Sequence, residues 1–276
     1  LNNLSVLLAD VGDREGALEA IREAVGIQRG LAEEDPGAFN PGLAMSLNNL
    51  SNRLADVGDR GGAVEAIREA VGIQRGLAEW NPAAFNPDLA MALNNLSNWL
   101  ADVGDRGGAV EAVREAVGIY RGLAKENPGA FNPGLAMSLN NLSNWLSKVG
   151  DRGGAVEAVR EAVGIRRGLA EEDPGAFNPG LASSLNNLSV RLADVGDRGG
   201  ALKAIREAVG IQRGLAKENP GAFNPDLASS LNNLSVQLAD VGDREDALKA
   251  VREAVGIYRG IAAGNPAVFE ADLVRA

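Results

Sequence analysis

The sequence contains no cysteine and no histidine, and only five of its 276 residues are lysine. The absence of cysteine excludes disulfides and thiolate metal sites, and it leaves the redox compartment open. The absence of histidine removes the commonest metal ligand and the usual acid–base group near neutral pH. We therefore expect neither a cofactor nor a metal site, and we expect the protein not to be an enzyme.

Positive charge is also scarce. The net charge is −10 and the sequence pI is about 4.7, which argues against nucleic acid or an anionic membrane surface as a partner. No apolar run approaches the ~20 residues that span a bilayer, and no signal peptide is recognisable. We expect a cytoplasmic protein. The abundance of Ala, Gly, Arg and Asp indicates a GC-rich bacterial gene.

The sequence consists instead of six similar copies of a 46-residue unit, which fill the chain without an insertion. A fixed period of this size is typical of a solenoid, in which each unit contacts only its neighbours. We predict a single array over 1–276. Because the first copy starts within the repeat, we expect the chain to be a piece of a longer protein. The copies are 1–46, 47–92, 93–138, 139–184, 185–230 and 231–276.

Each unit carries the signals of two helices. Apolar residues follow helical spacing over Leu1–Val11, and Gly12 is expected to end this helix. Asp13 then reads as the N-cap of a second helix that lasts to about Glu34. A connector over 35–41 should break the chain before the next first helix.

Within that connector, Asn40 suits an N-cap and Pro41 suits the first helical position. Gly26 and Gly30 lie inside the second helix, where each costs up to about 1 kcal/mol relative to alanine, so we predict close helix contact there. All six phenylalanines occupy one connector position. We expect them to fill the gap between units, with ligand stacking as the alternative: Phe39, Phe85, Phe131, Phe177, Phe223 and Phe269.

The apolar and small residues of one unit carry a family resemblance. If Gly12 lies between two paired helices, the signature positions of the tetratricopeptide repeat fall on Leu4, Ser5, Leu8, Ala17, Ile21 and Ala24. The segments LNNLS, GDREGAL and AIREAVGI resemble in particular the repeats of kinesin light chains. The resemblance implies an all-α, right-handed superhelical solenoid of six stacked antiparallel helix pairs. The unit is longer than the kinesin light chain repeat and Arg14 replaces a turn tyrosine, so the curvature stays open.

The same resemblance implies a concave groove, lined by the first helices, that binds a peptide or a partner protein. In peptide-binding relatives the asparagine at the third position bonds the backbone of the ligand, and an amide offers both donors and an acceptor for this. The alternative is that these asparagines only bond between neighbouring helices. They are Asn3, Asn49, Asn95, Asn141, Asn187 and Asn233.

The positions that differ between units are further candidates. Position 6 is Asn52, Asn98 and Asn144 in three units, and Val in the others. Position 7 changes between Leu, Arg, Trp and Gln, so we expect it to face solvent or to lie at a rim. Trp99 and Trp145 there form a candidate hot spot. Position 28 also varies, as Gln, Tyr or Arg. Neutral drift at exposed sites is the alternative.

Acidic residues recur at position 10 and predict an acidic row that would favour a basic peptide. Its members are Asp10, Asp56, Asp102, Asp194 and Asp240, with Lys148 interrupting it. A plain solvated face is the alternative. On the second helices, Glu65 with Arg68 and Arg75 with Glu79 have helical pairing distances.

We conclude from the sequence that the protein is a scaffold that binds an extended peptide or partner segment. GDRGGA lacks the pattern of a phosphate-binding loop and recurs as the turn between helices. Two alternatives remain. One is a structural array that associates head to tail, the C-terminal half-helix of one molecule completing the first helix of the next. The other is a sensor or regulatory arm of a larger bacterial signalling protein.

Overall fold

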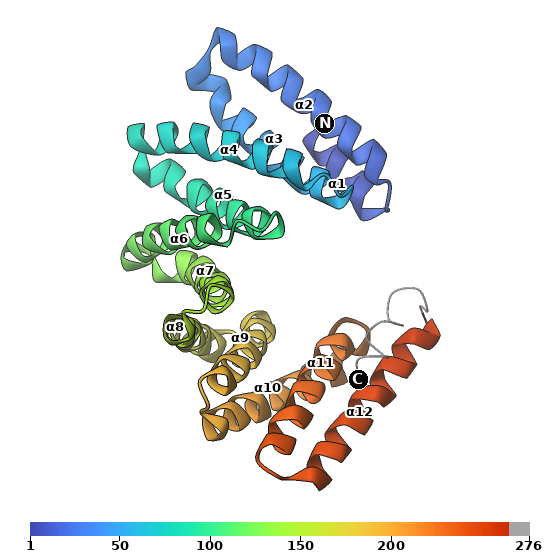
Figure 1. Ribbon diagram of the computed structural model, residues 1–276. Coiled ribbons are helices and arrows are strands. Elements are labelled where there is room, and N and C mark those ends of the chain that lie inside the picture. Colours follow the sequence, from blue (N-terminus) through green and yellow to red (C-terminus); the bar gives the residue numbers. More distant parts are fainter. Residues whose placement is uncertain (265–276) are drawn as a thin grey trace. The chain divides into compact units, whose positions relative to one another are not determined.

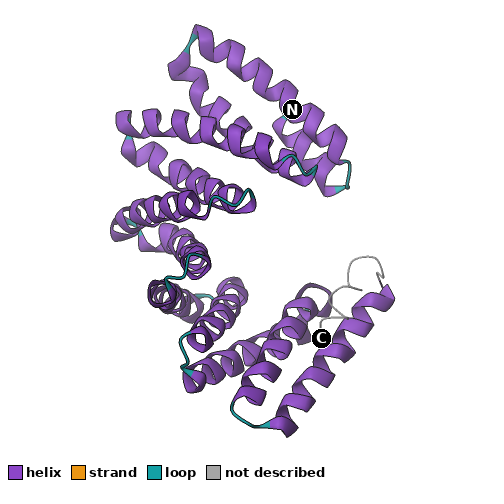
Figure 2. Ribbon diagram, viewed as in Figure 1, coloured by secondary structure: helices purple, strands orange, loops and turns teal. Residues whose placement is uncertain are grey.

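A computed structural model describes residues 1–264 of the chain, and this part is built from α-helices joined by short turns, with no strand (Figures 1 and 2). Consecutive helices pack side by side as pairs. The chain divides into two compact units, Leu1–Val149 and Gly150–Ala276. The helices are α1 (Asn2–Asp10), α2 (Arg14–Glu34), α3 (Pro36–Asp56), α4 (Arg60–Trp80), α5 (Pro82–Asp102), α6 (Arg106–Glu126), α7 (Pro128–Lys148), α8 (Arg152–Glu172), α9 (Pro174–Asp194), α10 (Arg198–Glu218), α11 (Pro220–Asp240) and α12 (Arg244–Gly264).

The turn between the two helices of a pair forms as the sequence predicts. Gly58 follows α3 with φ of +86°, a left-handed conformation that glycine adopts without steric cost. The next residue, Asp59, caps α4, because its Oδ1 accepts a hydrogen bond from the backbone N–H of Gly62 at 2.9 Å. Gly12 and Asp13 make the same turn in the first repeat.

The connector between pairs is helical, so the expected break before Pro41 is wrong. Helix α3 begins at Pro36, and Asp35 is its N-cap, accepting a hydrogen bond from Ala38 N–H at 3.1 Å. Pro41 lies inside the helix. The backbone N–H that it lacks would have bonded the carbonyl of Gly37, which lies at the exposed start of the helix within reach of water.

The core of each compact unit comes from the apolar stripes of its helices. In the first unit Ile21, Leu47, Ile67, Leu93 and Leu139 are almost completely buried. In the second unit a continuous cluster runs from Val156 to Tyr258. The transfer of such side chains out of water is what holds paired helices together.

The phenylalanines of the connector support this core. Phe177 and Phe223 are half-buried and pack against the cluster of the second compact unit. The expectation that they fill the space between repeats is confirmed for these two. Phe269 lies outside the described residues.

The paired glycines of the second helices do not make the close contact that we expected. Gly26 and Gly30 are exposed, and a Cβ atom added at either would meet no atom within 4 Å outside its own helix backbone. The equivalent pairs in the other five repeats are equally open. The prediction of helix contact at these glycines is wrong.

The second helices are linked to each other by ion pairs across repeats. Arg75 of α4 bonds Glu115 of α6 at 2.5 Å, so its predicted pairing with Glu79 is replaced. The same link joins Arg29 to Glu69 at 2.9 Å. The side chains stay about half exposed, and exposed pairs of this kind contribute at most about 1 kcal/mol each.

Arginines of the turn add a second link. The guanidinium of Arg14, the residue in place of the turn tyrosine, donates to the backbone carbonyl of Asp56 at 3.3 Å. That carbonyl lies at the end of α3, where backbone oxygens lack partners within the helix. Arg152 makes the same hydrogen bond to Asp194.

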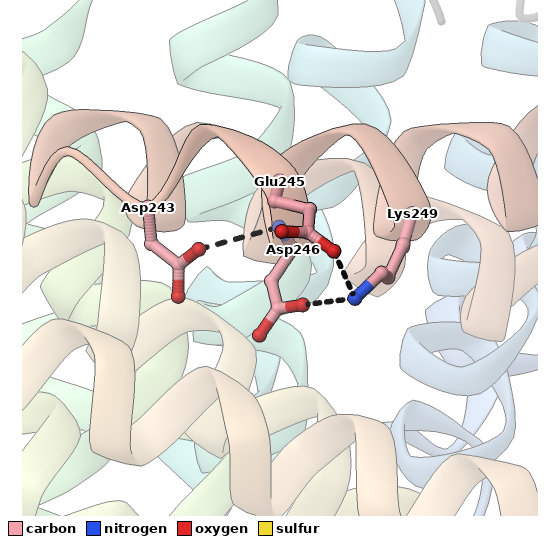
Figure 3. A network of polar contacts seen from close by, with 4 residues as sticks. All are labelled: Asp243, Glu245, Asp246 and Lys249. Carbon is pink, nitrogen blue, oxygen red and sulfur yellow. Dashed lines mark hydrogen bonds and ion pairs between the residues drawn. The ribbon is translucent and has the colours of Figure 1, made fainter.

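The last described helix starts differently from the others. At the start of α12, Lys249 bonds Asp246 at 2.9 Å and Glu245 at 3.0 Å (Figure 3). These hydrogen bonds, above all the one to Asp246, raise the pKa of Lys249. The N–H of Asp246 donates to the cap Asp243 at 3.3 Å. Glu245, Asp246 and Lys249 are exposed and Asp243 is partly buried, so this network is a solvated helix start.

Candidate functional site

On each of the helices α3, α5 and α7, one face toward solvent combines a methionine with polar side chains. On α3 this face consists of Met45, Asn49, Asn52 and Asp56, whose spacing of four, three and four residues places them on one side of the helix. Met45 is 55% exposed. We name the corresponding residues of α3, α5 and α7 the Met–Asn face. It adds Met91, Asn95, Asn98, Asp102, Met137, Asn141, Asn144 and Lys148.

The Met–Asn face belongs to the first compact unit alone. All three methionines of the chain lie on it. At the same positions α9 carries Ser183 and Val190, and α11 carries Ser229 and Val236. Methionine and asparagine therefore occur together on three consecutive first helices, and serine and valine occur together on the two others.

The asparagine at the third position takes part in bonds between helices. Asn95 Nδ2 donates to Asn48 Oδ1 at 2.9 Å, and Asn233 Nδ2 donates to Asn186 Oδ1 at 3.0 Å. These two asparagines therefore bond between neighbouring first helices. Each bond uses one N–H, and an amide has a second N–H and an acceptor oxygen. Asn3 is exposed, whereas Asn49, Asn141 and Asn187 are half-buried.

The two tryptophans at position 7 point toward the preceding first helix. Trp145 is 9% exposed and donates from Nε1 to Ser97 Oγ at 3.3 Å. Trp99 is half-buried and bonds Ser51 in the same way. The expectation that position 7 faces solvent or lies at a rim is wrong for Trp145 and for Gln237, which are both buried. The indole N–H of each tryptophan bonds a serine of the preceding first helix, and this hydrogen bond keeps the ring between the two helices.

The acidic row at position 10 is partly neutralised. Asp56 bonds Arg53 at 2.9 Å and Asp194 bonds Arg191 at 2.8 Å. Where Trp145 replaces that arginine, Lys148 lies 4.2 Å from the centre of the tryptophan ring. Asp102 is exposed and pairs with no cation in residues 1–264. The row is therefore not continuously acidic.

A cleft of about 470 Å³ lies between α3 and α5. Met45 and Met91 form its rim with Asn48 and Asn49, and we name it the α3–α5 cleft. Gln74 of α4 lines it although only 5% of that residue is exposed. Asp88 at the start of α5 is exposed and is its one charged lining residue. The remaining lining residues are Pro41, Gly42, Ala44 and Ala92.

Gln74 and Asp88 occupy positions 28 and 42 of the repeat, and the residues at these two positions meet in other repeats too. The ring of Tyr120 packs against Gly134, and a Cβ atom added at that glycine would lie only 2.7 Å from the ring. The Arg166 guanidinium donates to the carbonyl of Gly180. The sequence marked position 28 as variable but gave no sign of this partner.

Burial shifts the pKa of two of these residues. It raises the pKa of the Tyr120 phenol, and the negative charge of Asp88 raises this pKa further. It lowers the pKa of Arg166. Both effects follow because burial disfavours the charged form of a group.

Within residues 1–264 no three acidic side chains come together as a metal site, and no helix is long and apolar enough to cross a membrane.

Comparison with known families identifies the repeat. The tetratricopeptide repeat family matches over residues 1–36, 43–77, 89–127, 135–174, 181–219 and 227–261. The chain belongs to the tetratricopeptide repeat family. No curated protein sequence matches it.

Solved structures share the fold at low identity. The crystal structure of BtubC (BKLC) from P. vanneervenii matches with a TM-score of 0.72 and 22% identity, covering 90% of this chain and 92% of that one. A putative kinesin light chain of Podosopora anserina with nearly identical repeats gives 0.60 and 18%, covering 80% and 96%. The apo form of RapI gives 0.61 and 14%, covering 94% and 96%. These likenesses support the all-α stack of helix pairs and the resemblance to kinesin light chains.

Proposed function

We propose that the protein is a non-enzymatic scaffold whose Met–Asn face binds an extended segment of a partner protein. The observation that carries this proposal is the repetition of an exposed methionine with two asparagines on α3, α5 and α7. Methionine is an adaptable apolar contact and asparagine bonds an extended backbone. We also propose that the protein is bacterial and that it is located in the cytoplasm, as expected from the sequence.

The spacing of the helices fits an extended ligand. Packed helices lie 8–10 Å apart, about three residues of extended chain at roughly 3.3 Å each. A segment that crosses three helices would therefore meet the same set of side chains at regular intervals. Asn98, Asn144 and the spare N–H of Asn95 are half-exposed donors along such a path.

Selection of peptides from a random display library on the full chain tests this proposal. The matched variant carries Met91→Ser and Asn98→Val, which copy the residues of α9 and α11, so we expect it to fold. Selected peptides should bind it at least about tenfold more weakly than the parent, as loss of one contact of about 1.4 kcal/mol requires. Equal binding to both proteins would refute the Met–Asn face as the site.

A second candidate function is head-to-tail self-association. Apolar side chains of helix α1 and its N-cap are exposed by between 43% and 63%: Leu1, Leu4, Val6 and Leu7. The C-terminal segment that would cover them lies in residues 265–276, outside the described part. Light scattering after size exclusion over a range of concentrations tests this candidate, and a constant monomer mass excludes it.

A further inference from the structure

The α3–α5 cleft contains a polar atom without a partner. Gln74 is 5% exposed, and its Oε1 is buried with no hydrogen bond in the described structure. Buried polar groups in folded proteins nearly always have a partner, and an unpaired one is costly. Because Gln74 lines the cleft, a movement of its amide would bring this acceptor to a hydrogen-bond donor placed inside.

The charge of the cleft favours a cation. Asp88 is exposed and no arginine or lysine is among the lining residues. The negative charge of Asp88 also raises the pKa of Tyr120, so this charge acts on the neighbouring tyrosine as well. An acidic ligand would be repelled by Asp88, whereas a cation would be attracted to it.

The walls of the cleft suit an alkyl chain. Met45 and Met91 are 55% and 45% exposed, and flexible thioether side chains adapt to slender apolar groups. Lysine and arginine place a charged end on such an apolar stem.

Equivalent places in other repeats show what this space accepts. Between α6 and α7 the ring of Tyr120 fills it against Gly134. Between α8 and α9 the chain's own Arg166 brings a guanidinium to position 42, where it bonds the carbonyl of Gly180. In the α3–α5 cleft the residue at position 28 is a shorter glutamine and position 42 is an aspartate, so space and a negative charge remain for a guest.

We propose that the α3–α5 cleft binds a lysine or arginine side chain of the partner. This inference rests on the proposed function, because the side chain belongs to the segment bound along the Met–Asn face. The stem lies between Met45 and Met91. The charged end donates to the Asp88 carboxylate and to Gln74 Oε1, and such charge-assisted bonds are the strong ones.

The three methionines give a direct assay. With methyl-labelled methionine, the full chain should give one NMR signal for each of Met45, Met91 and Met137. The probes are Nα-acetyl-lysine methylamide and the norleucine analogue, which has the stem without the charge. We expect the lysine probe to shift Met45 and Met91 saturably, and Met137 to stay in place because Tyr120 fills the space beside Gly134. Norleucine should have no effect.

Three variants sharpen the assay. Asp88→Asn should abolish the shifts of Met45 and Met91. Asp226→Asn makes the same change of charge in α11 and should leave them intact. Gln74→Tyr combined with Asp88→Gly copies the filled arrangement of Tyr120 and Gly134, and should close the cleft in a folded protein. Equal shifts with norleucine, no shift at saturating probe, or equal loss with Asp226→Asn would each overturn the proposal.

The selected peptides separate this inference from the proposed function. We expect them to contain a lysine or arginine and to bind Asp88→Asn about 10- to 100-fold more weakly, the range of a charged hydrogen bond. If peptides depend on the Met–Asn face but carry no such residue and ignore Asp88→Asn, the scaffold stands and the cation cleft is refuted. If no peptide depends on that face, the proposed function itself fails.

Discussion

The open glycines of the second helices lead to a prediction of opposite effects for one substitution. Gly118 and Gly122 lie in the middle and near the end of α6, are exposed, and have no atom within 4 Å of an added Cβ outside the helix backbone. Alanine in a helix interior is better than glycine by about 0.8–1 kcal/mol. The double substitution Gly118→Ala with Gly122→Ala should therefore stabilise the protein by about 1.5–2 kcal/mol.

Gly104, two residues before the start of α6, should respond in the other direction. Its φ of +89° disfavours any side chain, so Gly104→Ala should cost about 1–2 kcal/mol. In a chain of this size 1 kcal/mol corresponds to about 2–4 °C in the unfolding midpoint. We expect a rise of about 3–8 °C for the double variant and a fall of about 2–8 °C for Gly104→Ala.

Thermal unfolding followed by far-ultraviolet circular dichroism measures both shifts, and hydrogen exchange of the α6 amides shows whether the change is local. A lower midpoint for the double variant would mean that an element packs on these glycines after all. That result would refute the open face and restore the close contact predicted from the sequence.

Three further predictions concern the core, the charges and the pH dependence. Leu139→Ala should cost about 2–5 kcal/mol in denaturant titration, because this leucine is completely buried; a cost below 1 kcal/mol would contradict the packing. Removing the exposed link with Arg75→Ala should cost no more than about 1 kcal/mol by the same assay, and Glu115→Ala should add little to it. Because the pKa of Tyr120 is raised in the fold, its contribution to stability is complete below the pH at which a free phenol ionises and is lost as the pH rises through the folded pKa. Ultraviolet titration, with Tyr120→Phe as the reference, should show that Asp88→Asn lowers this pKa. An unchanged pKa would contradict the charge effect.

The helix pairs could be predicted from the sequence because their signals are local. Gly58 and Asp59 form the only strong turn signal between α3 and α4, and the structure places the turn there. The connector was ambiguous, since Asp35–Pro36 and Asn40–Pro41 are both suited to an N-cap followed by proline. The structure uses the first pair, and the helix thereby gains several residues at the cost of one missing hydrogen bond at Pro41.

The site was less predictable because it depends on contacts between repeats. The variability of position 7 favoured exposure, yet Trp145 is held inside by Ser97, 48 residues away. The cleft depends on positions 28 and 42 together. In the last repeat, Tyr258 is the residue type of the filled arrangement and Asp272 is that of the open cleft. The sequence alone therefore does not predict whether a cleft is filled or open.

Each pair at positions 28 and 42 lies within one short segment, 14 residues from Arg166 to Gly180 in the fourth repeat. The repeats share their period and their core residues, so unequal recombination that exchanges such a segment between copies would leave the helix packing unchanged. Duplication of the gene segment would then shift an open cleft by one whole repeat in a single event. A globular domain has no comparable route, because moving a binding position there requires coordinated substitutions throughout its core.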